Sequence, residues 1–521
     1  MAIKMDTKPT VIGLDFGNCN SFPCFISEFD SDTKIGGNVH DLLPGGMNDG
    51  IPSVFFYSDK TGVLCGENAV RSRARPVQNR KRYLKRHLGK TMTLDKREFS
   101  YDEAITEVIQ HCVRVANRQL QSGWQLSTNL LSLAYPASYT FAQRQYLIEQ
   151  AEKATLADGT PVKVYGTIAE PAAAALDYLA ESGDSKEAAV LVYDLGGGTF
   201  DLALVAVYPQ GRKNSEGDTY YYDIVDVGGL DDVGGAEFDE IMYQLLTKKF
   251  QVSLKPSHKE KLRAESERIK KDLSTDSYAE AELLYNDEYL SVQVTREEFE
   301  DASRDLLQKT IAATKTMLAE HSNQQPDYIV LTGGASQMPM IRKTLETEIP
   351  EFKEKIRDFR PNRAIAYGAA RYGTTELISE IRTEENGSMI QRRTAYDLGI
   401  RFFHSKDDEK GYISTYIPAG TPIPYKTDFQ SSHTLLEKQR YSMFRVNEAK
   451  TAHPNTENVS DDYTEIMRVQ LDRGKEVPKG TKSETRLCID KLGVLTIEAR
   501  EVDHPENKIQ NNVELTNLRK S

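Results

Sequence analysis

The chain has 521 residues, which is long enough for several domains and excludes a single small core. Apolar residues make up 39% of it and charged residues 28%, which is typical of a globular protein rather than a disordered one. The 66 Lys and Arg against 78 Asp and Glu give a net charge of -12, so neither nucleic acid nor an anionic membrane is an expected partner.

The cysteine pattern and the apolar runs both bear on the compartment. The five cysteines are odd in number, and none shows the two-residue spacing of a zinc or dithiol site. No stretch reaches the roughly 18 apolar residues that a membrane span needs, and the first ten residues do not resemble a targeting segment. We therefore expect a cytoplasmic protein.

Two segments far apart in the chain follow one plan. Residues 11–26 and residues 190–207 each contain an apolar strand, an aspartate, a tight turn with glycine and a second apolar strand. An internal repeat of this kind indicates a duplicated half. From residue 10 to about 377, apolar strand-like runs alternate with charged helical patterns, so we expect an α/β core.

The turn of the second hairpin carries the strongest chemical signal. Its three successive glycines at 196–198 leave the backbone N–H groups free to close around an anion, and Thr199 adds a hydroxyl donor. Asp194 and Asp201 bracket the turn, where carboxylates can hold the water shell of a Mg²⁺ ion bound to phosphate. A plain glycine-rich hairpin without a ligand is the alternative for this motif alone.

A third glycine element follows the apolar run that begins after Asp327. Gly333 and Gly334 end this run, and we expect a helix soon after Pro339. Glycines at the end of a strand let a flat ring or a ribose approach the backbone, and a helix start offers free N–H groups. An ordinary turn between strand and helix is an equally good interpretation of this element by itself.

The three glycine elements become specific in combination with two further motifs, IAEPAAAA at residues 168–175 and RPNRAIAYGAA at residues 360–370. Together they resemble the heat-shock-70 chaperone family, which belongs to the actin and hexokinase-like ATPase superfamily. The resemblance covers residues 11–372 well and residues 396–515 more loosely. It implies an α/β fold with a duplicated actin-like ATPase domain, followed by a C-terminal all-β sandwich.

The resemblance also implies ATP or ADP with Mg²⁺ as ligands. Asp15, Asp194 and Glu170 fall where the family holds the metal's water shell, and Asp201 where it positions the attacking water. Lys85 matches the catalytic lysine, a cation near the γ-phosphate, although a basic run such as residues 80–86 is ordinarily a solvated helix face. With Thr199, the implied catalytic set is Lys85, Asp194, Asp201, Glu170 and Thr199.

The nucleotide-binding residues that the resemblance implies come from five places in the chain. Residues 267–274 match the family's adenosine-binding helix, on which side chains three and four positions apart share a face. Without the match, this segment is an ordinary charged amphipathic helix. The full set is Gly17, Asn18, Cys19, Gly196, Gly197, Gly198, Glu267, Lys270, Lys271, Ser274, Gly333, Gly334, Ala335, Gln337 and Asn362.

Four of these positions depart from the family pattern. Asn18 and Cys19 replace paired hydroxyl residues, Gln337 replaces an arginine that stacks on adenine, and Asn362 replaces an aspartate near the ribose. Each change removes a contact, so we expect weaker nucleotide binding. The asparagine after Asp-Phe-Gly also resembles the ribosome-associated, non-hydrolysing branch of the family.

The rest of the chain divides into a linker and a β-domain. Residues 382–393 are polar and aperiodic, which indicates a linker between an actin-like domain at 1–381 and a β-sandwich at 394–521. Short alternating runs predict strands at 413–417, 441–446, 466–471 and 494–499. The resemblance implies that this domain binds extended polypeptide through backbone hydrogen bonds and an apolar pocket. A β-domain without an open groove is the alternative.

Two readings of function follow. The first is an ATP-binding and ATP-hydrolysing chaperone-like protein that binds unfolded or extended polypeptide, with a J-domain co-chaperone and a nucleotide-exchange factor as implied partners. The second is a nucleotide-bound, non-hydrolysing scaffold or co-chaperone. Pro136 and Arg144 fall where the family couples nucleotide state to the second domain. Because the chain ends soon after the last expected strand, we expect no helical lid.

Overall fold

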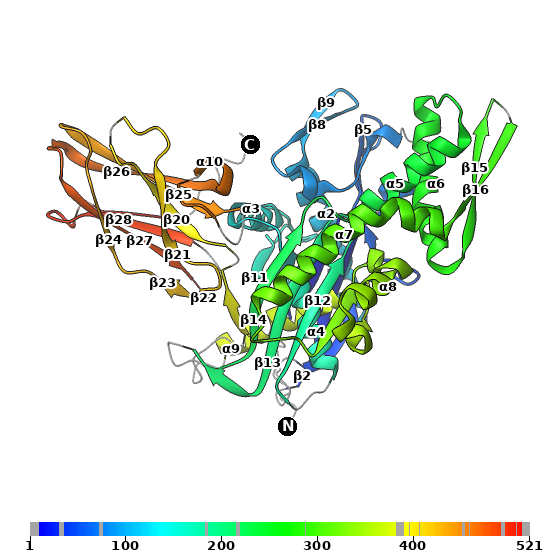
Figure 1. The fold of residues 1–521 in the computed structure, drawn as a ribbon, viewed down its shortest axis with the longest axis horizontal. Coiled ribbons are helices and arrows are strands. Elements are labelled where there is room, and N and C mark those ends of the chain that lie inside the picture. Colours follow the sequence, from blue (N-terminus) through cyan, green and yellow to red (C-terminus); the bar gives the residue numbers. More distant parts are fainter. Residues whose placement is uncertain are drawn as a thin grey trace.

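The computed structural model describes residues 10–512, with gaps at 31–35, 72–76, 183–185, 215–218, 287, 382–389, 395, 406, 451–453, 458, 491–494 and 507. Figure 1 shows an α/β part in blue to yellow-green and an all-β part, in yellow to red, on one side of it. Among the described residues, no helix is long and apolar enough to cross a membrane.

The first large sheet is built around the first of the two predicted hairpins. Its strand order is β11-β10-β1-β2-β3, and β4 also pairs with β2. β1 lies parallel to β10. It lies antiparallel to β2, because a short turn joins these two strands. The strands are β1 (Ile12–Phe16), β2 (Asn20–Asp30), β3 (Gly36–Asp41), β4 (Ile51–Pro52), β10 (Leu130–Tyr135) and β11 (Lys163–Ala169).

The second large sheet repeats this arrangement around the second hairpin. Its order is β18-β17-β12-β13-β14, continued by β19 and β22. β12 lies parallel to β17 and antiparallel to β13, as β1 does to β10 and β2. The strands are β12 (Ala188–Leu195), β13 (Phe200–Lys213), β14 (Thr219–Leu230), β17 (Tyr328–Thr332), β18 (Ile356–Asp358), β19 (Ile390–Arg393) and β22 (Pro422–Ile423). The shared order and direction confirm the predicted duplication.

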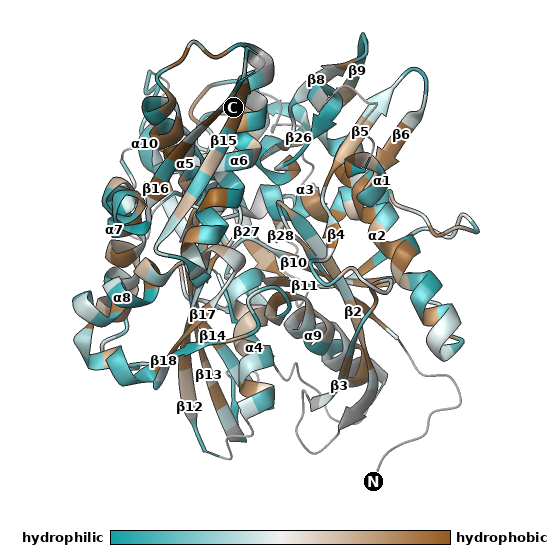
Figure 2. Ribbon diagram, turned by 90° about the vertical axis from the view of Figure 1, so that its right-hand side faces the viewer, coloured by the Kyte–Doolittle hydropathy of each residue, from teal (hydrophilic) through white to brown (hydrophobic). Residues whose placement is uncertain are grey.

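Two helices lie between the large sheets, as Figure 2 shows. Helix α4 (Glu170–Ser182) follows the first sheet and packs mainly on β12 and β13 of the second. Helix α9 (Ala364–Ile381) follows the second sheet and packs on β1, β2, β10 and β11 of the first. The two helices approach closely, because a Cβ atom on Gly368 would lie 1.8 Å from the carbonyl oxygen of Ala173. Glycine is therefore required at this crossing.

The outer faces of both sheets are covered by other helices. Alternate residues of β12 and β13, such as Leu191 and Leu202, pack against helices on the outer face, whereas Val190 and Ala203 face α4. Capping boxes begin three of the helices, at Ser100, Thr140 and Thr295. The covering helices are α2 (Tyr101–Trp124), α3 (Phe141–Glu152), α7 (Arg296–Glu320) and α8 (Pro339–Glu348). Helices α5 (Gly235–Phe250) and α6 (Pro256–Thr275) pack against each other, and α5 also packs against α7.

Both lobes also contain smaller elements. They are β5 (Phe55–Ser58), β6 (Gly62–Cys65), α1 (Glu67–Val70), η1 (Val77–Asn79), β7 (Arg80–Lys81), η2 (Leu84–His87), β8 (Thr91–Leu94) and β9 (Arg97–Ser100) in the first lobe. In the second lobe they are the hairpin β15 (Tyr278–Tyr285) and β16 (Glu288–Thr295), η3 (Gly334–Gln337) and η4 (Pro350–Lys355).

The C-terminal part is a sandwich of two antiparallel sheets, in the orders β21-β20-β25-β26 and β23-β27-β28-β29, with β24 also paired to β27. Residues from both sheets, such as Ile400, Val446, Leu487 and Ile497, share one core. Its elements are β20 (Leu398–Phe402), β21 (Tyr412–Ile417), β23 (Tyr425–Lys426), β24 (Gln430–His433), β25 (Gln439–Ala449), α10 (Val459–Asp462), β26 (Tyr463–Val477), β27 (Lys482–Ile489), β28 (Leu495–Glu501) and β29 (Lys508–Asn512). The predicted α/β fold with a C-terminal β-sandwich is confirmed.

The second half of the predicted linker is a strand. Residues 382–389 lie outside the described residues, but Ile390–Arg393 forms β19, which pairs with β14 of the large sheet and with β22. The Arg393 guanidinium also donates to both carboxylate oxygens of Asp223, at 3.0 and 2.8 Å. The aperiodic sequence did not indicate this strand. The domain limits at 381 and 394 stay a prediction.

Candidate functional site

Four buried carboxylates and one lysine meet where the two lobes face each other. Asp15 lies near the end of β1, Asp194 near the end of β12 and Asp201 near the start of β13, and Glu170 is the first residue of α4; none of the four is more than 8% exposed. Lys85, on η2, is also buried, and its Nζ atom lies 2.5 Å from Oε1 of Glu170. The structure therefore brings the predicted catalytic and metal residues together.

The pKa values of three of these carboxyl groups are raised because they share a buried site. Burial, reinforced by the charge of Glu170, raises the pKa of Asp15 to about 7, against the opposing effect of Lys85. Burial likewise raises the pKa of Asp201 to about 7, although Thr199 donates a hydrogen bond to it. The pKa of Asp194 lies well above its usual range, first because of burial and then because of Asp201.

This cluster fits a hydrated divalent cation. Four carboxylates face one ammonium group, and the Oδ1 atom of Asp194 is buried without a hydrogen-bond partner. Within the described residues, no three His, Cys, Asp or Glu side chains lie close enough together to hold a metal ion directly. A cation surrounded by water would satisfy both observations, since Mg²⁺ keeps several waters in such sites.

The two hairpin turns pack against each other beside the carboxylates. A Cβ atom on Gly197 would lie 2.6 Å from the Sγ atom of Cys19, and one on Gly198 would lie 2.4 Å from Nδ2 of Asn18. The first turn fills the space that a side chain at 197 or 198 would take, so a larger residue at either position would have to displace Cys19 or Asn18. A plain hairpin imposes no such requirement.

The start of α5 orients the second turn. The N–H group of Gly235 donates to the carbonyl oxygen of Gly196, and that of Ala236 donates to Gly197, both at 2.9 Å. A Cβ atom on Gly234 would lie 2.7 Å from the nitrogen of Thr199, so this position also needs glycine. Residues 234 and 235 were missed in the sequence, although a glycine pair before a helix was a usable signal.

Arg86 joins the two lobes, and sequence reasoning missed it too. Its guanidinium donates to both carboxylate oxygens of Glu237, at 2.7 and 2.9 Å, and to the carbonyl oxygen of Gly198. The basic run around the predicted Lys85 indicated a cation here. Its partner was not visible, because Glu237 is 151 positions away.

The third glycine element lies against the end of β12. Gly333 has φ of 81°, and a Cβ atom there would lie 2.4 Å from Oδ1 of Asp194. Gly334 faces Asn362, since a Cβ atom on it would lie 3.6 Å from the Asn362 Oδ1 atom. Ala335 is buried and Gln337 is exposed on η3. The predicted strand, glycine pair and helix are therefore all present.

The predicted adenosine helix is part of α6, and it faces the first turn. Lys270 is buried; its Nζ atom lies 2.7 Å from Asp239 and donates to the carbonyl oxygen of Gly235 at 3.0 Å. Lys271 is exposed and pairs with Glu267 at 2.8 Å. Burial, and after it the charge of Glu267, raises the pKa of Cys19, so the helix and the first turn are neighbours.

Part of the same helix lines a small pocket. Ser274 is half-buried and donates to the carbonyl oxygen of Lys270 at 3.4 Å. Both side chains border this pocket together with Leu273, Arg296, Phe299, Glu300, Met338, Pro339 and Met340. This pocket of about 10 Å³ is too small to hold a nucleoside, but its lining shows that the helix meets the end of the third glycine element.

A line of contacts runs from the carboxylates to the β-sandwich. The N–H group of Ala137, directly after Pro136, donates to Oδ1 of Asp201 at 2.6 Å. Arg144 lies in the first turn of α3, and its Nη2 atom is 3.8 Å from Oε1 of the buried Glu448 on β25. The two residues predicted to couple the domains thus lie close together in the first lobe, where their segment contacts Asp201 at one end and Glu448 at the other.

Comparisons with known proteins agree with this architecture. The family model described as Hsp70 protein matches residues 93–520. The chaperone protein DnaK of Thermotoga petrophila is 25% identical over 558 aligned positions, which cover 98% of this chain and 87% of that protein, and DnaK of Thermotoga maritima gives the same values. DnaK of Buchnera aphidicola subsp. Schizaphis graminum is 24% identical, covering 94% of this chain and 76% of the relative.

Proposed function

The chain belongs to the Hsp70 family, and we propose that it is an ATP-dependent chaperone whose interlobe site hydrolyses ATP and whose β-sandwich binds extended polypeptide. The observation that carries this proposal is the cluster of four buried carboxylates and Lys85 beside two packed turns. A structural role alone does not explain a buried site with this excess of negative charge.

The two turns are suited to the phosphate groups. We propose that Gly17, Asn18 and Cys19 from one turn and Gly196 to Gly198 from the other line the β- and γ-phosphates, with backbone N–H groups as donors. The N–H group of Gly196 is not one of these donors, contrary to the sequence expectation, because it donates to the carbonyl oxygen of Thr199 at 3.0 Å. Thr199 adds a hydroxyl group, which in this structure is bonded to Asp201. Cys19 and Asn18 fill the space beside Gly197 and Gly198, so phosphate oxygens would approach this turn from the side that the first turn leaves open.

The charged groups have distinct roles in the proposed reaction. Asp15, Asp194 and Glu170 hold the water shell of Mg²⁺, which neutralises charge on the phosphate oxygens. Glu170 also fixes the Lys85 ammonium group at 2.5 Å, so that this cation can stabilise negative charge on the transferred phosphoryl group. Asp201 accepts a proton from the attacking water, which its pKa of about 7 favours at neutral pH.

The nucleoside is proposed to lie between α6 and the third glycine element. Glu267, Lys270, Lys271 and Ser274 would border it on one side, and Gly333, Gly334, Ala335, Gln337 and Asn362 on the other. Lys270 is already bound to Asp239 and Gly235, so it acts mainly by holding the helix against α5. Pro136 and Arg144 would transmit the nucleotide state to the β-sandwich. A J-domain co-chaperone and a nucleotide-exchange factor would regulate the cycle.

One observation favours the second candidate, a nucleotide-bound scaffold without turnover. Asn18 and Cys19 stand where the family has hydroxyl residues, and they fill the space against Gly198 and Gly197. The Asn18 amide can still donate to a phosphate oxygen, but the Cys19 thiol is a weaker donor than a hydroxyl group. Binding without hydrolysis is the expected behaviour of such a scaffold.

Titration calorimetry with ATP and ADP, followed by turnover assays, tests both candidates. We expect binding of either nucleotide only in the presence of Mg²⁺, and slow ATP hydrolysis that an unfolded polypeptide accelerates. Tight binding with no phosphate release would support the scaffold instead. The absence of binding to either nucleotide would contradict both.

A further inference from the structure

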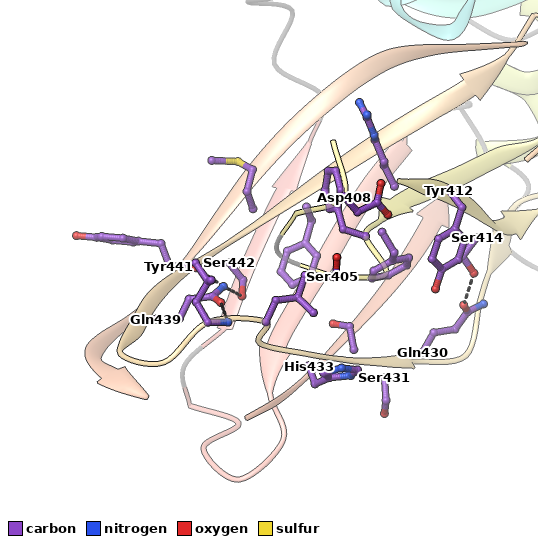
Figure 3. A pocket seen from close by; sticks show the side chains of 18 of the residues that line it. Ser405, Asp408, Tyr412, Ser414, Gln430, Ser431, His433, Gln439, Tyr441 and Ser442 are labelled. Atoms are coloured by element: carbon purple, nitrogen blue, oxygen red, sulfur yellow. Dashed lines mark hydrogen bonds between the residues drawn. The ribbon is translucent and has the colours of Figure 1, made fainter. Parts of the chain in front are cut away.

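A pocket of about 550 Å³ opens in the β-sandwich beside strand β24 (Figure 3). It lies between the sheet of β20, β21 and β25 and the edge of the other sheet. Its lining differs from the apolar pocket expected from the sequence, because hydroxyl and amide groups alternate with aromatic rings around it. Ser405, Tyr412, Ser414, Gln430 and Ser442 surround the cavity, whereas Tyr441 points away from it.

Aromatic side chains form the apolar walls. The rings of Phe402 and Tyr412 have centroids 6.2 Å apart, and Phe444 is buried between the sheets. At the rim, Leu436 is 49% exposed and Met443 is 43% exposed, so apolar surface is available without a partner from the described residues. Rings of this kind favour an aromatic guest, which they can contact face to edge.

The uncharged polar groups have hydrogen-bonding capacity left over. Ser414 donates to the side-chain oxygen of Gln430 at 3.3 Å, so the amide N–H groups of Gln430 stay available. Those N–H groups and the Tyr412 hydroxyl have no partner among the described residues. A bound side chain that covers these groups without forming hydrogen bonds to them would remove their hydrogen bonds to water, which costs free energy.

The charged residues of the lining are already engaged. Arg401 donates to the carbonyl oxygens of Glu409 and Lys410. Asp408 accepts from the backbone N–H groups of His404, Lys410 and Gly411. Both side chains therefore shape the loop that borders the pocket, and neither selects a charged guest.

An unpaired strand edge borders the same pocket. Within the described part of the chain, β27 is the one strand that pairs with β24. Gln430 and Ser432 of β24 are half-buried, whereas Ser431 and His433 are exposed. An extended segment that adds to this edge would direct every second side chain toward the pocket.

We propose that this pocket selects extended polypeptide segments that contain a tyrosine over segments with an aliphatic residue at the same place. The ring would lie against Phe402 and Tyr412, and the phenol oxygen would accept from the amide of Gln430. A leucine would cover the same amide and leave it without a partner. This inference rests on the proposed function, because it names the class of segment that the β-sandwich binds.

Three fluorescein-labelled heptapeptides that differ only at the central residue test it with the full chain, by fluorescence anisotropy. The tyrosine peptide is expected to bind about tenfold more tightly than the leucine peptide, through ring contacts and the satisfied amide. The phenylalanine peptide, which keeps the ring but loses the hydroxyl, is expected about threefold below tyrosine.

The variant Gln430→Leu is expected to remove the difference between tyrosine and phenylalanine. Gln121→Leu, at an exposed position of α2, is the control and should keep it. Leucine binding as tightly as tyrosine would overturn this inference and leave the proposed chaperone function in place. No binding of any peptide would overturn both, and the parent series alone decides if Gln430→Leu does not fold.

Discussion

The two hairpins share a scaffold but differ in their turns. β1 and β2 frame Gly17, Asn18 and Cys19, whereas β12 and β13 frame three glycines and Thr199. The side chains of the first turn occupy the space left empty by the glycines of the second. The halves of the molecule are therefore complementary rather than identical, and a glycine on one side depends on a larger group on the other.

The same complementarity holds where the halves cross, and Gly368→Ala should break it most severely. The added Cβ atom would lie 1.8 Å from the backbone oxygen of Ala173, which cannot rotate away as a side chain can. We expect the free energy of unfolding to fall by about 3 kcal/mol in urea titrations. Gly123→Ala, in α2 with nothing within 4 Å, should instead stabilise the chain by about 0.5 kcal/mol. Equal effects of the two changes would contradict the crossing.

The raised pKa values of Asp15 and Asp201, one from each hairpin, offer a second test. Each has a pKa of about 7 in the folded chain, against about 4 when unfolded. The folded state thus binds more protons at these two groups between these values, so their contribution to stability is fully present below pH 4 and is lost as the pH rises through 7.

Asp201→Asn should flatten this decline by roughly 1 to 3 kcal/mol, because the amide does not titrate. Thermal unfolding without nucleotide, from pH 4.5 to 8, measures it. Asp158→Asn, at an exposed turn, is the control and should leave the slope between pH 5 and 8 unchanged. A decline in Asp201→Asn that is as steep as in the parent would show that groups other than Asp201 cause it.

Lys85→Ala sharpens the comparison at the level of catalysis, because this residue serves the site that both turns share. We expect ATP turnover to fall tenfold or more while the dissociation constant for ATP changes little, since the lost charge acts in the transition state. Lys90→Ala, an exposed neighbour, should keep both values. Unchanged turnover in Lys85→Ala would remove this residue from the mechanism.

Gln337→Arg should have the smallest effect. An arginine at this exposed position of η3 can stack on the adenine ring, and we expect ATP to bind more tightly by about 0.5 to 1 kcal/mol. Calorimetry with ATP measures the change, and Gln337→Lys controls for charge alone. Identical affinities of the arginine variant and the parent would mean that the adenine ring lies elsewhere.

The local parts of the fold could be predicted from the sequence. Strands expected at 413–417, 441–446 and 466–471 lie within β21, β25 and β26, because alternating apolar residues reflect one buried face. The repeated hairpin plan likewise predicted the duplicated sheets. Val494 of the fourth expected strand lies outside the described residues, and the rest of it is in β28.

Contacts between distant segments could not be predicted in the same way. Strand β19 forms because Ile390 and Gln391 meet β14, more than 160 positions earlier, and its four residues have no pattern of their own. Arg86 and Glu237 are ordinary charged residues until the lobes bring them together. The polar pocket of the β-sandwich was unexpected for the same reason, since its groups come from strands whose alternation predicts only which side faces inward.

Strand β19 has a consequence for proteases. Arg392 and Arg393 are the kind of residue after which trypsin cleaves, yet both lie in a strand that is paired with β14 on one edge and with β22 on the other. A protease binds its substrate as an extended, unpaired segment, so it reaches these bonds only after the strand leaves the sheet. The rate of cleavage at this point would therefore report how often strand β19 leaves the sheet that joins the two α/β lobes to the β-sandwich.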